Sequence, residues 1–225
     1  MTETMSNTKM SRNIYYAILA LCLTAAFTGC GKSGEDAEKL FQQGKTASEA
    51  KDYETAAKYF TSAAELGNAE AQYQLGLLSY QKKFAVGDKT ETAKWILKAA
   101  ENGHAEAQML LSLLYHEGEW IGKNDAESMK WLRKAAEQGH PEAEFVLGLA
   151  YYLGQNVKRD IAEAVNWFRK AAEQGHVDAQ VCLGECYRTG DGVAKDLAEA
   201  KTWYEKAAAQ GNANAKVLLR RFGSE

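Results

Sequence analysis

The stretch AEFVLGLAYYLGQNVKRDIAEAVNWFRKAAEQG, residues 143–175, predicts two helices joined by a polar loop. Its first half is apolar at four positions on one helical face: Ala143, Leu147, Ala150 and Tyr151. Asp160 closes the loop and is placed to cap a second helix, from about Ile161 to Gln174. Gly175 follows, where a helix commonly ends in a left-handed residue. The stretch therefore predicts a helical hairpin.

The same pattern recurs every 36 residues. Four blocks align without gaps: Asn68–Gly103, His104–Gly139, His140–Gly175 and His176–Gly211. Each block repeats a tryptophan, at Trp95, Trp131, Trp167 and Trp203. A shorter hairpin is expected upstream, over residues 37–67, and a capping helix downstream, over residues 212–225. Because a period of this length is typical of stacked repeats, the expected fold class is an all-α solenoid of helical hairpins.

The composition agrees with this class. One Pro in 225 residues is a helix-forming balance and excludes an all-β fold. Lys and Arg together number 27 against 30 Asp and Glu, which gives a net charge of −3. Nucleic acid is therefore not an expected partner, since its binders carry a concentrated basic surface.

The block of residues 140–175 resembles the Sel1-like repeat, a relative of the tetratricopeptide repeat. The resemblance rests on Ala143, Leu147, Gly148, Tyr151, Gly154, Asp160, Ala164, Trp167, Lys170, Ala171, Ala172 and Gly175. It extends over residues 68–211, with Ser112 in place of the helix glycine in the second block. Residues 37–67 resemble a tetratricopeptide-type unit. The resemblance implies a right-handed α-solenoid whose first helices face a concave groove.

The N-terminus predicts an export signal. Residues 14–27 are free of charge and follow Lys9 and Arg12, but they are too few to span a bilayer, which takes about 20 residues. The following Phe27-Thr28-Gly29-Cys30 resembles the lipobox of bacterial lipoproteins. That resemblance implies a signal peptide at residues 1–29, lipidation of Cys30, a tether at residues 30–36 and an outer-membrane anchor facing the periplasm. A plain secretory signal and an uncleaved anchor are the alternatives.

No convergent catalytic group is expected. His104, His140 and His176 occupy the same position in successive blocks, about 10 Å apart, so they cannot share a metal and are predicted to cap helices. Ser48-x-x-Lys51 has the spacing of penicillin-interacting enzymes but lacks the partner motifs. Neither a metal nor another cofactor is expected, and the chain is not expected to be an enzyme.

Cys182 and Cys186 are four residues apart on one predicted helix. A redox pair or a metal site is one interpretation, and two buried thiols in the core is the favoured one. A disulfide at this spacing would strain the helix.

The predicted first helices carry a second apolar stripe, away from Ala71 and Leu75. Its members are Tyr73, Leu77 and Tyr80; Met109, Leu113 and His116; Phe145, Leu149 and Tyr152; and Val181, Glu185 and Arg188. A helix that is apolar on two faces is either buried on both or offers one for binding, so the stripe is a candidate partner surface, and packing between hairpins is the alternative. Trp120, in a loop and expected to be exposed, is a secondary candidate. An acidic row, Glu70, Glu106, Glu142 and Asp178, is explained by favourable interaction with helix N-termini.

The functional hypothesis is a lipid-anchored periplasmic scaffold that binds a protein or peptide in its concave groove, as an adaptor in an envelope assembly. The alternative, implied by the resemblance to Sel1-like lipoproteins, is an immunity protein that neutralises a secreted antibacterial toxin such as a phospholipase. A hydrolase acting on peptidoglycan or β-lactams is a third, less favoured hypothesis. No small-molecule substrate is expected.

Overall fold

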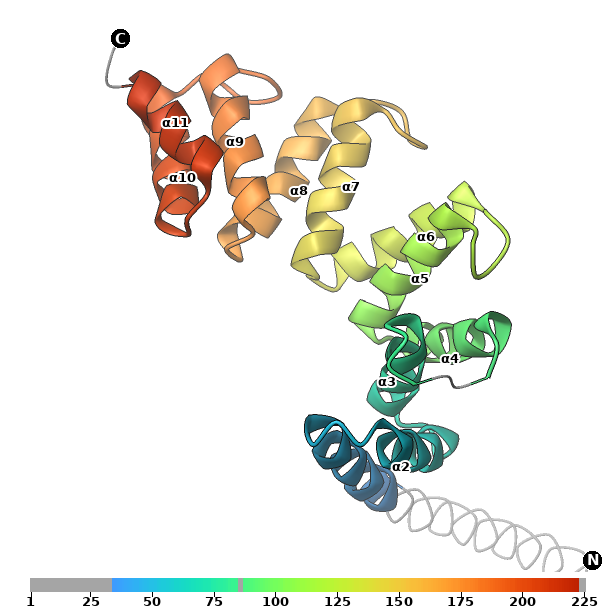
Figure 1. Ribbon diagram of the computed structural model, residues 1–225. Coiled ribbons are helices and arrows are strands. Elements are labelled where there is room, and N and C mark those ends of the chain that lie inside the picture. The colour runs from blue at the N-terminus through green and yellow to red at the C-terminus, as the bar shows by residue number, and fades with distance from the viewer. Residues whose placement is uncertain (1–33, 85–86, 223–225) are drawn as a thin grey trace, which may run out of the picture. The chain divides into compact units, whose positions relative to one another are not determined.

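The computed structural model describes residues 34–84 and 87–222, and within these ranges every regular element is a helix. The first helix is described over residues 34–49. The others are α2 (Tyr53–Glu65), α3 (Ala69–Tyr80), α4 (Lys89–Glu101), α5 (Ala105–Glu117), α6 (Asp125–Glu137), α7 (Pro141–Leu153), α8 (Ile161–Glu173), α9 (Val177–Thr189), α10 (Leu197–Ala209) and α11 (Ala213–Phe222) (Figure 1). The chain divides into two compact units, Met1–Val86 and Gly87–Glu225. The predicted all-α fold is confirmed.

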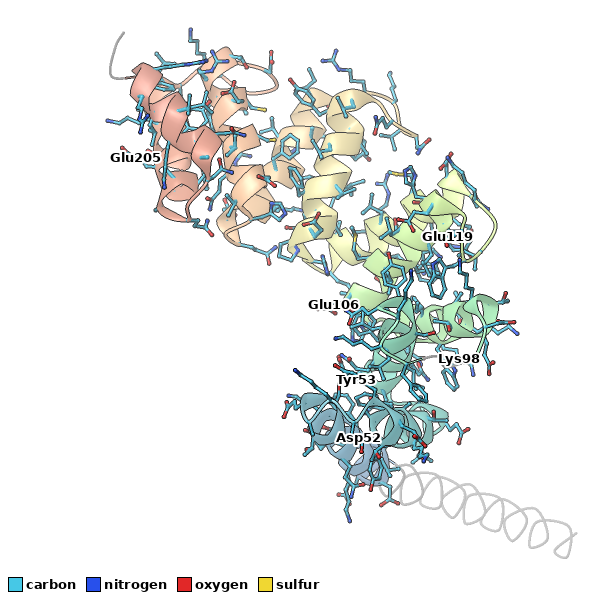
Figure 2. All side chains as sticks on the ribbon, viewed as in Figure 1. Asp52, Tyr53, Lys98, Glu106, Glu119 and Glu205 are labelled. Atoms are coloured by element: carbon cyan, nitrogen blue, oxygen red, sulfur yellow. The ribbon has the colours of Figure 1, made fainter. Side chains whose placement is uncertain are left out.

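Within the second unit, from α4 to α11, the main packing is between helices that are adjacent in the chain. The pairs α5–α6, α7–α8 and α9–α10 are the hairpins, and α11 packs on α10. Charged side chains such as Lys98, Glu106 and Glu205 are exposed on the outside of these helices (Figure 2). Stacked hairpins with contacts only between neighbours form an α-solenoid, as the repeat predicts.

The two helices of each 36-residue block begin in different ways. The first helices α5, α7 and α9 are capped by His104, His140 and His176, whose Nδ1 atoms each accept a backbone N–H at 3.2 Å. The second helix α8 is capped by Asp160, which accepts the N–H of Glu163 at 3.0 Å. Gly175 follows α8 with φ of 91°. The predicted capping roles of the histidines, Asp160 and Gly175 are confirmed.

Helix pairs approach closely where a glycine faces a large side chain. A Cβ built on Gly148 would lie 2.7 Å from the ring of Phe168, and one on Gly184 would lie 2.6 Å from the ring of Tyr204. In the second block the glycine is replaced by Ser112, and the smaller Leu132 stands at the repeat position of Phe168. The added hydroxyl of Ser112 lies 3.2 Å from the Ser128 hydroxyl, within hydrogen-bond distance, and the Ser128 hydroxyl also donates to the Ser112 carbonyl at 2.9 Å.

The recurrent tryptophans lie under lysines one helical turn further on. The Nζ atoms of these lysines are 3.8–4.3 Å from the indole centroids, in the pairs Lys98–Trp95, Lys134–Trp131, Lys170–Trp167 and Lys206–Trp203. A cation at this distance from an aromatic face is attracted to it. The Trp-x-x-Lys part of the repeat is therefore a structural element of the second helices.

The first unit has the same construction with a shorter hairpin. Phe60 of α2 faces Gly44 of the first helix, where a Cβ would lie 2.5 Å from the ring. The spacing from glycine to aromatic residue is 16 here, against 20 for Gly148 and Phe168. The difference of four residues is the shorter loop that the sequence predicts.

Candidate partner-binding site

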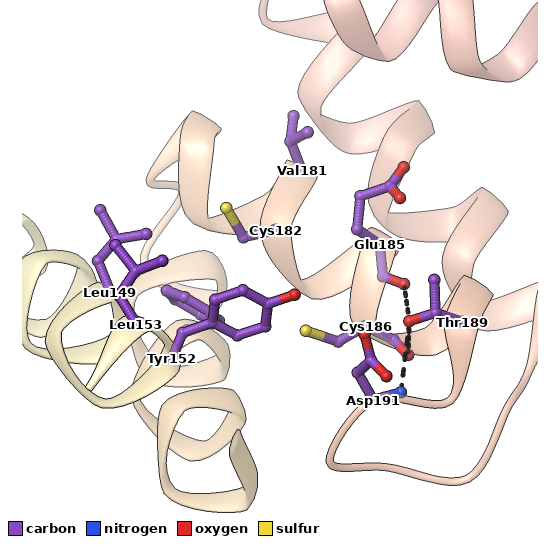
Figure 3. Close-up of a pocket in the computed structure, with 10 residues that line it drawn as sticks. Leu149, Tyr152, Leu153, Val181, Cys182, Glu185, Cys186, Thr189 and Asp191 are labelled. Carbon is purple, nitrogen blue, oxygen red and sulfur yellow. Dashed lines mark hydrogen bonds between the residues drawn. The ribbon is translucent and has the colours of Figure 1, made fainter. Parts of the chain in front are cut away.

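A pocket of about 330 Å³ opens between α7, α8 and α9, and we call it the α7–α9 pocket (Figure 3). It contains four residues of the predicted stripe, Leu149, Tyr152, Val181 and Glu185. The remaining wall is formed by Leu153, Phe168, Cys182, Cys186, Thr189 and Asp191. The structure therefore brings the stripes of two successive repeats together around one concave site.

The α7 wall of the pocket consists of a packed tyrosine ring and an exposed leucine. The Tyr152 ring packs against buried Phe168 with 6.3 Å between centroids, and the Arg159 guanidinium lies 5.9 Å from the same tyrosine ring. Figure 3 shows the Tyr152 side chain extending from α7 toward α9. Leu153 lies on the same wall with 55% of its surface exposed. An exposed leucine beside a held aromatic ring is a suitable contact for an apolar partner side chain.

The wall from α9 carries two free thiols that point into the pocket (Figure 3). Cys186 is buried and Cys182 is half-buried. Burial raises the pKa of Cys182 to about 11 and that of Cys186 to about 12, so both stay protonated at neutral pH. Because the thiolate is the nucleophile and metal ligand, these cysteines act here as small apolar wall residues. The prediction of two buried core thiols is confirmed for Cys186, whereas Cys182 is half-buried at the edge of the core and faces the pocket.

Glu185 forms the polar end of the pocket. Its carboxylate accepts hydrogen bonds from the Arg188 Nη2 at 2.6 Å and the Tyr204 hydroxyl at 2.5 Å. Burial disfavours the charge of Glu185, but the hydrogen bonds from Arg188 and Tyr204 outweigh it and hold its pKa below the ordinary value. The carboxylate is therefore charged and already paired.

A second cavity, of about 490 Å³, shares Glu185 with the α7–α9 pocket. It is lined by Glu185, Arg188, Lys195, Leu197, Leu218, Arg221 and Phe222, and we call it the basic cleft. Arg188 belongs to the predicted stripe, whereas Lys195 and Arg221 are not among the binding residues predicted from the sequence. These two residues lie in a loop and in the terminal helix, so no stripe along a single helix could have grouped them.

Other predicted residues pack within the solenoid. The Phe145 ring stacks on His176 with centroids 4.6 Å apart, and Met109 packs against the core formed around Leu132 and Leu147. For these positions the structure favours the packing alternative. Leu113 is half-buried and His116 is exposed, with its Nδ1 atom 3.5 Å from Asp125. Neither lines the two cavities.

The remaining candidates lie elsewhere. Tyr73, Leu77 and Tyr80 are half-buried residues of α3 in the first unit. Trp120 is half-buried rather than exposed, and the Lys89 Nζ lies 5.4 Å from its ring centroid. Cys30 and the apolar run at residues 14–27 lie outside the described residues.

The described part of the chain offers little for metal chemistry. It contains no group of three or more His, Cys, Asp or Glu side chains that could hold a metal ion. In the same residues no helix has the length and apolarity needed to cross a membrane.

Comparison with known proteins identifies the family. The Sel1 repeat profile matches residues 30–68, 69–104, 105–140, 141–176 and 177–212, so the chain belongs to the Sel1 repeat family. The first match includes the hairpin that the sequence analysis compares with the tetratricopeptide repeat. No curated protein sequence matches the chain.

Solved structures agree with the family. A Sel1 repeat protein from Oxalobacter formigenes is 39% identical with a TM-score of 0.72, over 75% of this chain and 49% of its own. The protective antigen c5321 of uropathogenic Escherichia coli is 32% identical with the same TM-score, over 81% of this chain and 40% of its own. The chain thus spans half or less of the length of these two relatives. Immunity protein Pa5087 of Pseudomonas aeruginosa shares the fold, at 19% identity and a TM-score of 0.50, over 70% of this chain and 60% of its own.

Proposed function

We propose that this chain is a lipid-anchored scaffold of the bacterial envelope that binds another protein at the α7–α9 pocket and acts as an adaptor in an envelope assembly. Membership of the Sel1 repeat family supports a scaffold suited to protein–protein interaction. The observation that carries the proposal is the pocket itself, where Leu149, Tyr152 and Val181 of the predicted stripe form one concave apolar wall. Apolar and aromatic side chains in such a wall are typical anchors of interfaces.

The chemistry of the pocket favours binding over catalysis. Its two cysteines are held protonated by burial, and its half-buried Glu185 carboxylate is already engaged by Arg188 and Tyr204. A nucleophile needs an adjacent base or a lowered pKa to react, and the pKa values of these thiols move the other way. What the pocket offers a partner is apolar surface.

A matched pair of substitutions tests the site. Leu153 in the pocket and Val217 on α11 are both exposed apolar residues of the second unit, at 55% and 46%. Leu153→Glu should abolish affinity capture of the partner from detergent-solubilised envelopes, whereas Val217→Glu should leave it intact, as judged by quantitative mass spectrometry. Equal capture by both variants would overturn the site. If the protein lost by Leu153→Glu is a secreted toxin, the chain serves immunity; a resident envelope protein would make it an adaptor.

The anchor is tested separately. Cys30→Ala removes the thiol that the lipid would modify, so the protein should move from the membrane fraction to the soluble periplasmic fraction. Ser33→Ala, in the tether, is the control and should stay with the membrane. Unchanged membrane fractionation of Cys30→Ala would contradict the lipid anchor.

A further inference from the structure

The α7–α9 pocket has an unpaired carboxylate at its edge. Asp191 lines the pocket, is exposed to solvent and forms no ion pair with any other described residue. Glu185, the other acidic wall residue, is paired with Arg188 at 2.6 Å. Arg159 donates to the Tyr152 carbonyl at 3.0 Å and is not a wall residue. The wall therefore carries one negative charge without a cation beside it.

The same loop position in the second block holds a carboxylate that is paired. Glu119 directly follows the left-handed glycine at the end of α5, as Asp191 does at the end of α9. Glu119 forms an ion pair with Lys89, which stands 30 residues earlier in the chain. The residue 30 positions before Asp191 is Ile161, which carries no charge. The fourth block thus presents the carboxylate without the cation that pairs with it in the second block.

The backbone fixes the position of Asp191. Its N–H donates to the Cys186 carbonyl at 3.2 Å and to the Thr189 hydroxyl at 3.3 Å. A Cβ built on Gly192, the next residue, would lie 2.7 Å from the Ile161 carbonyl oxygen, so the loop lies directly against the start of α8. Figure 3 shows Asp191 beside Cys186 at the end of the pocket. Because the backbone is already ordered, a ligand that pairs with Asp191 has less conformational freedom to remove.

The charge of Asp191 also acts on the inside of the pocket. Burial is the main cause of the raised pKa of Cys186, and the Asp191 carboxylate raises that pKa further. A negative charge that disfavours a thiolate favours a cation in the same place. The apolar side chains of Leu149, Leu153 and Val181 line this pocket. An ion pair formed beside such walls is less screened by water than one on an open surface.

We propose that the partner binds through a basic peptide segment, with a Lys or Arg side chain on Asp191 and an apolar side chain from a neighbouring position in the α7–α9 pocket. Such a segment complements both the apolar wall and the unpaired carboxylate. An acidic segment would place like charges together at this edge of the pocket. This inference rests on the proposed function and adds the charge of the partner segment.

The test is selection of ligands from a random peptide display library on the full chain, purified in detergent. The wild type should enrich peptides that combine a leucine or aromatic residue with a neighbouring Lys or Arg. These peptides should bind Asp191→Asn about threefold more weakly. They should bind Asp191→Lys about tenfold more weakly, because like charges then face each other. The control Glu137→Lys makes the same charge reversal at an exposed position outside the pocket, and should keep the affinity of the wild type.

A charge exchange distinguishes an ion pair from a disturbed loop. A selected peptide whose basic residue is changed to glutamate should bind Asp191→Lys more tightly than it binds the wild type. Weaker binding of this peptide to Asp191→Lys would contradict the ion pair.

The remaining outcomes separate the inference from the proposed function. Enriched peptides without basic residues, or basic peptides that bind both Asp191 variants as tightly as the wild type, would overturn the inference. If such peptides still lose binding with Leu153→Ser, which removes an apolar wall side chain without adding charge, the proposed function stands without it. If no peptide is enriched, or if Leu153→Ser binds every selected peptide normally, both the inference and the proposed binding site are overturned.

Discussion

At the scale of single residues, the repeat places one buried amide in the first helices. Gln72, Gln108 and Gln180 donate their Nε2 hydrogens to the carbonyls of Ala64, Ala100 and Ala172, at 3.0–3.1 Å. Glu144 occupies the same position in the third block. As a carboxylate it has no hydrogen to donate, and it instead accepts a bond from Gln174 at 2.7 Å. Burial raises the pKa of Glu144 above its ordinary value.

Replacing this carboxylate should stabilise the protein. Glu144→Gln restores a side-chain donor for the Ala136 carbonyl and removes a buried charge, so the free energy of unfolding should rise by about 1 kcal/mol at about pH 7. The gain should be smaller at about pH 4, below the ordinary value of 4.5, because the carboxyl is then protonated in both the folded and the unfolded state. The cost of the wild-type carboxylate appears as the pH rises through the folded-state pKa. Urea unfolding of the wild type and Glu144→Gln at the two pH values measures this difference in the free energy of unfolding.

The exposed Glu137→Gln is the control for this substitution and should change stability little. An equal gain from Glu144→Gln at both pH values would show that the buried charge contributes nothing.

The capping role of the histidines can be tested by substituting the asparagine that occupies the equivalent position at other helices. Asn68 and Asn212 stand where His104, His140 and His176 stand, and both cap with their side-chain oxygens, at 2.8 and 3.0 Å. His140→Asn should therefore leave the stability of α7 within about 0.5 kcal/mol of the wild type, whereas His140→Ala should cost about 1 kcal/mol. Amide hydrogen exchange in the first turn of α7 distinguishes the two. Equal exchange rates in both variants would contradict a capping role for the imidazole.

At the scale of the elements, hairpins are held together by complementary sizes. Gly148 faces Phe168 and Gly184 faces Tyr204, while the block that carries Ser112 has the smaller Leu132 at the repeat position of these rings. Where the residue on the first helix is larger, the residue at the matching position of the second helix is thus smaller, as close packing requires.

This complementarity predicts non-additive substitutions in the α7–α8 hairpin. Gly148→Ala places a Cβ 2.7 Å from the Phe168 ring, and should lower the free energy of unfolding by about 1–3 kcal/mol. In a Phe168→Leu background the same alanine should be neutral or stabilising, because the ring is gone and alanine favours helix by about 1 kcal/mol over glycine. A double-mutant cycle from urea unfolding gives the coupling. An additive cycle would show that this contact does not limit the approach of the helices.

The elements themselves could be predicted from the sequence, because each depends on residues close together in the chain. The period of 36, the caps at His140 and Asp160 and the turn at Gly175 are local patterns. Which residues of the apolar stripe are buried and which stay accessible could not be predicted, because that depends on the side chains of the next repeat that pack against them. Phe145 is covered by His176 of the following block, whereas Leu149 is left to line a pocket.

The basic cleft shows the same limit. Lys195 and Arg221 come from a loop and from the terminal helix. Their proximity follows from how α11 packs on α10, and their spacing in the chain carries no regular signal.

At the scale of the whole molecule, α11 covers one side of α10. Ala215 of α11 is fully buried and packs with Ala200, Tyr204 and Ala207 of α10. The opposite side of α11 is exposed, at Lys216, Val217 and Arg220. The buried face of α11 thus covers apolar residues of α10 that would otherwise be exposed.

A charge placed in this contact should have a local effect. Ala215→Asp buries a carboxylate without a partner and should destabilise the α10–α11 contact by more than about 2 kcal/mol. Because each helix of this unit packs chiefly on its chain neighbours, hydrogen-exchange protection should fall in α10 and α11 and be retained in α5 and α6. Asn214→Asp adds the same carboxylate at the neighbouring exposed position and should leave protection unchanged throughout. Equal loss of protection from α5 to α11 in Ala215→Asp would instead mean that the unit unfolds as one cooperative body, and that the nearest-neighbour description of its stability is wrong.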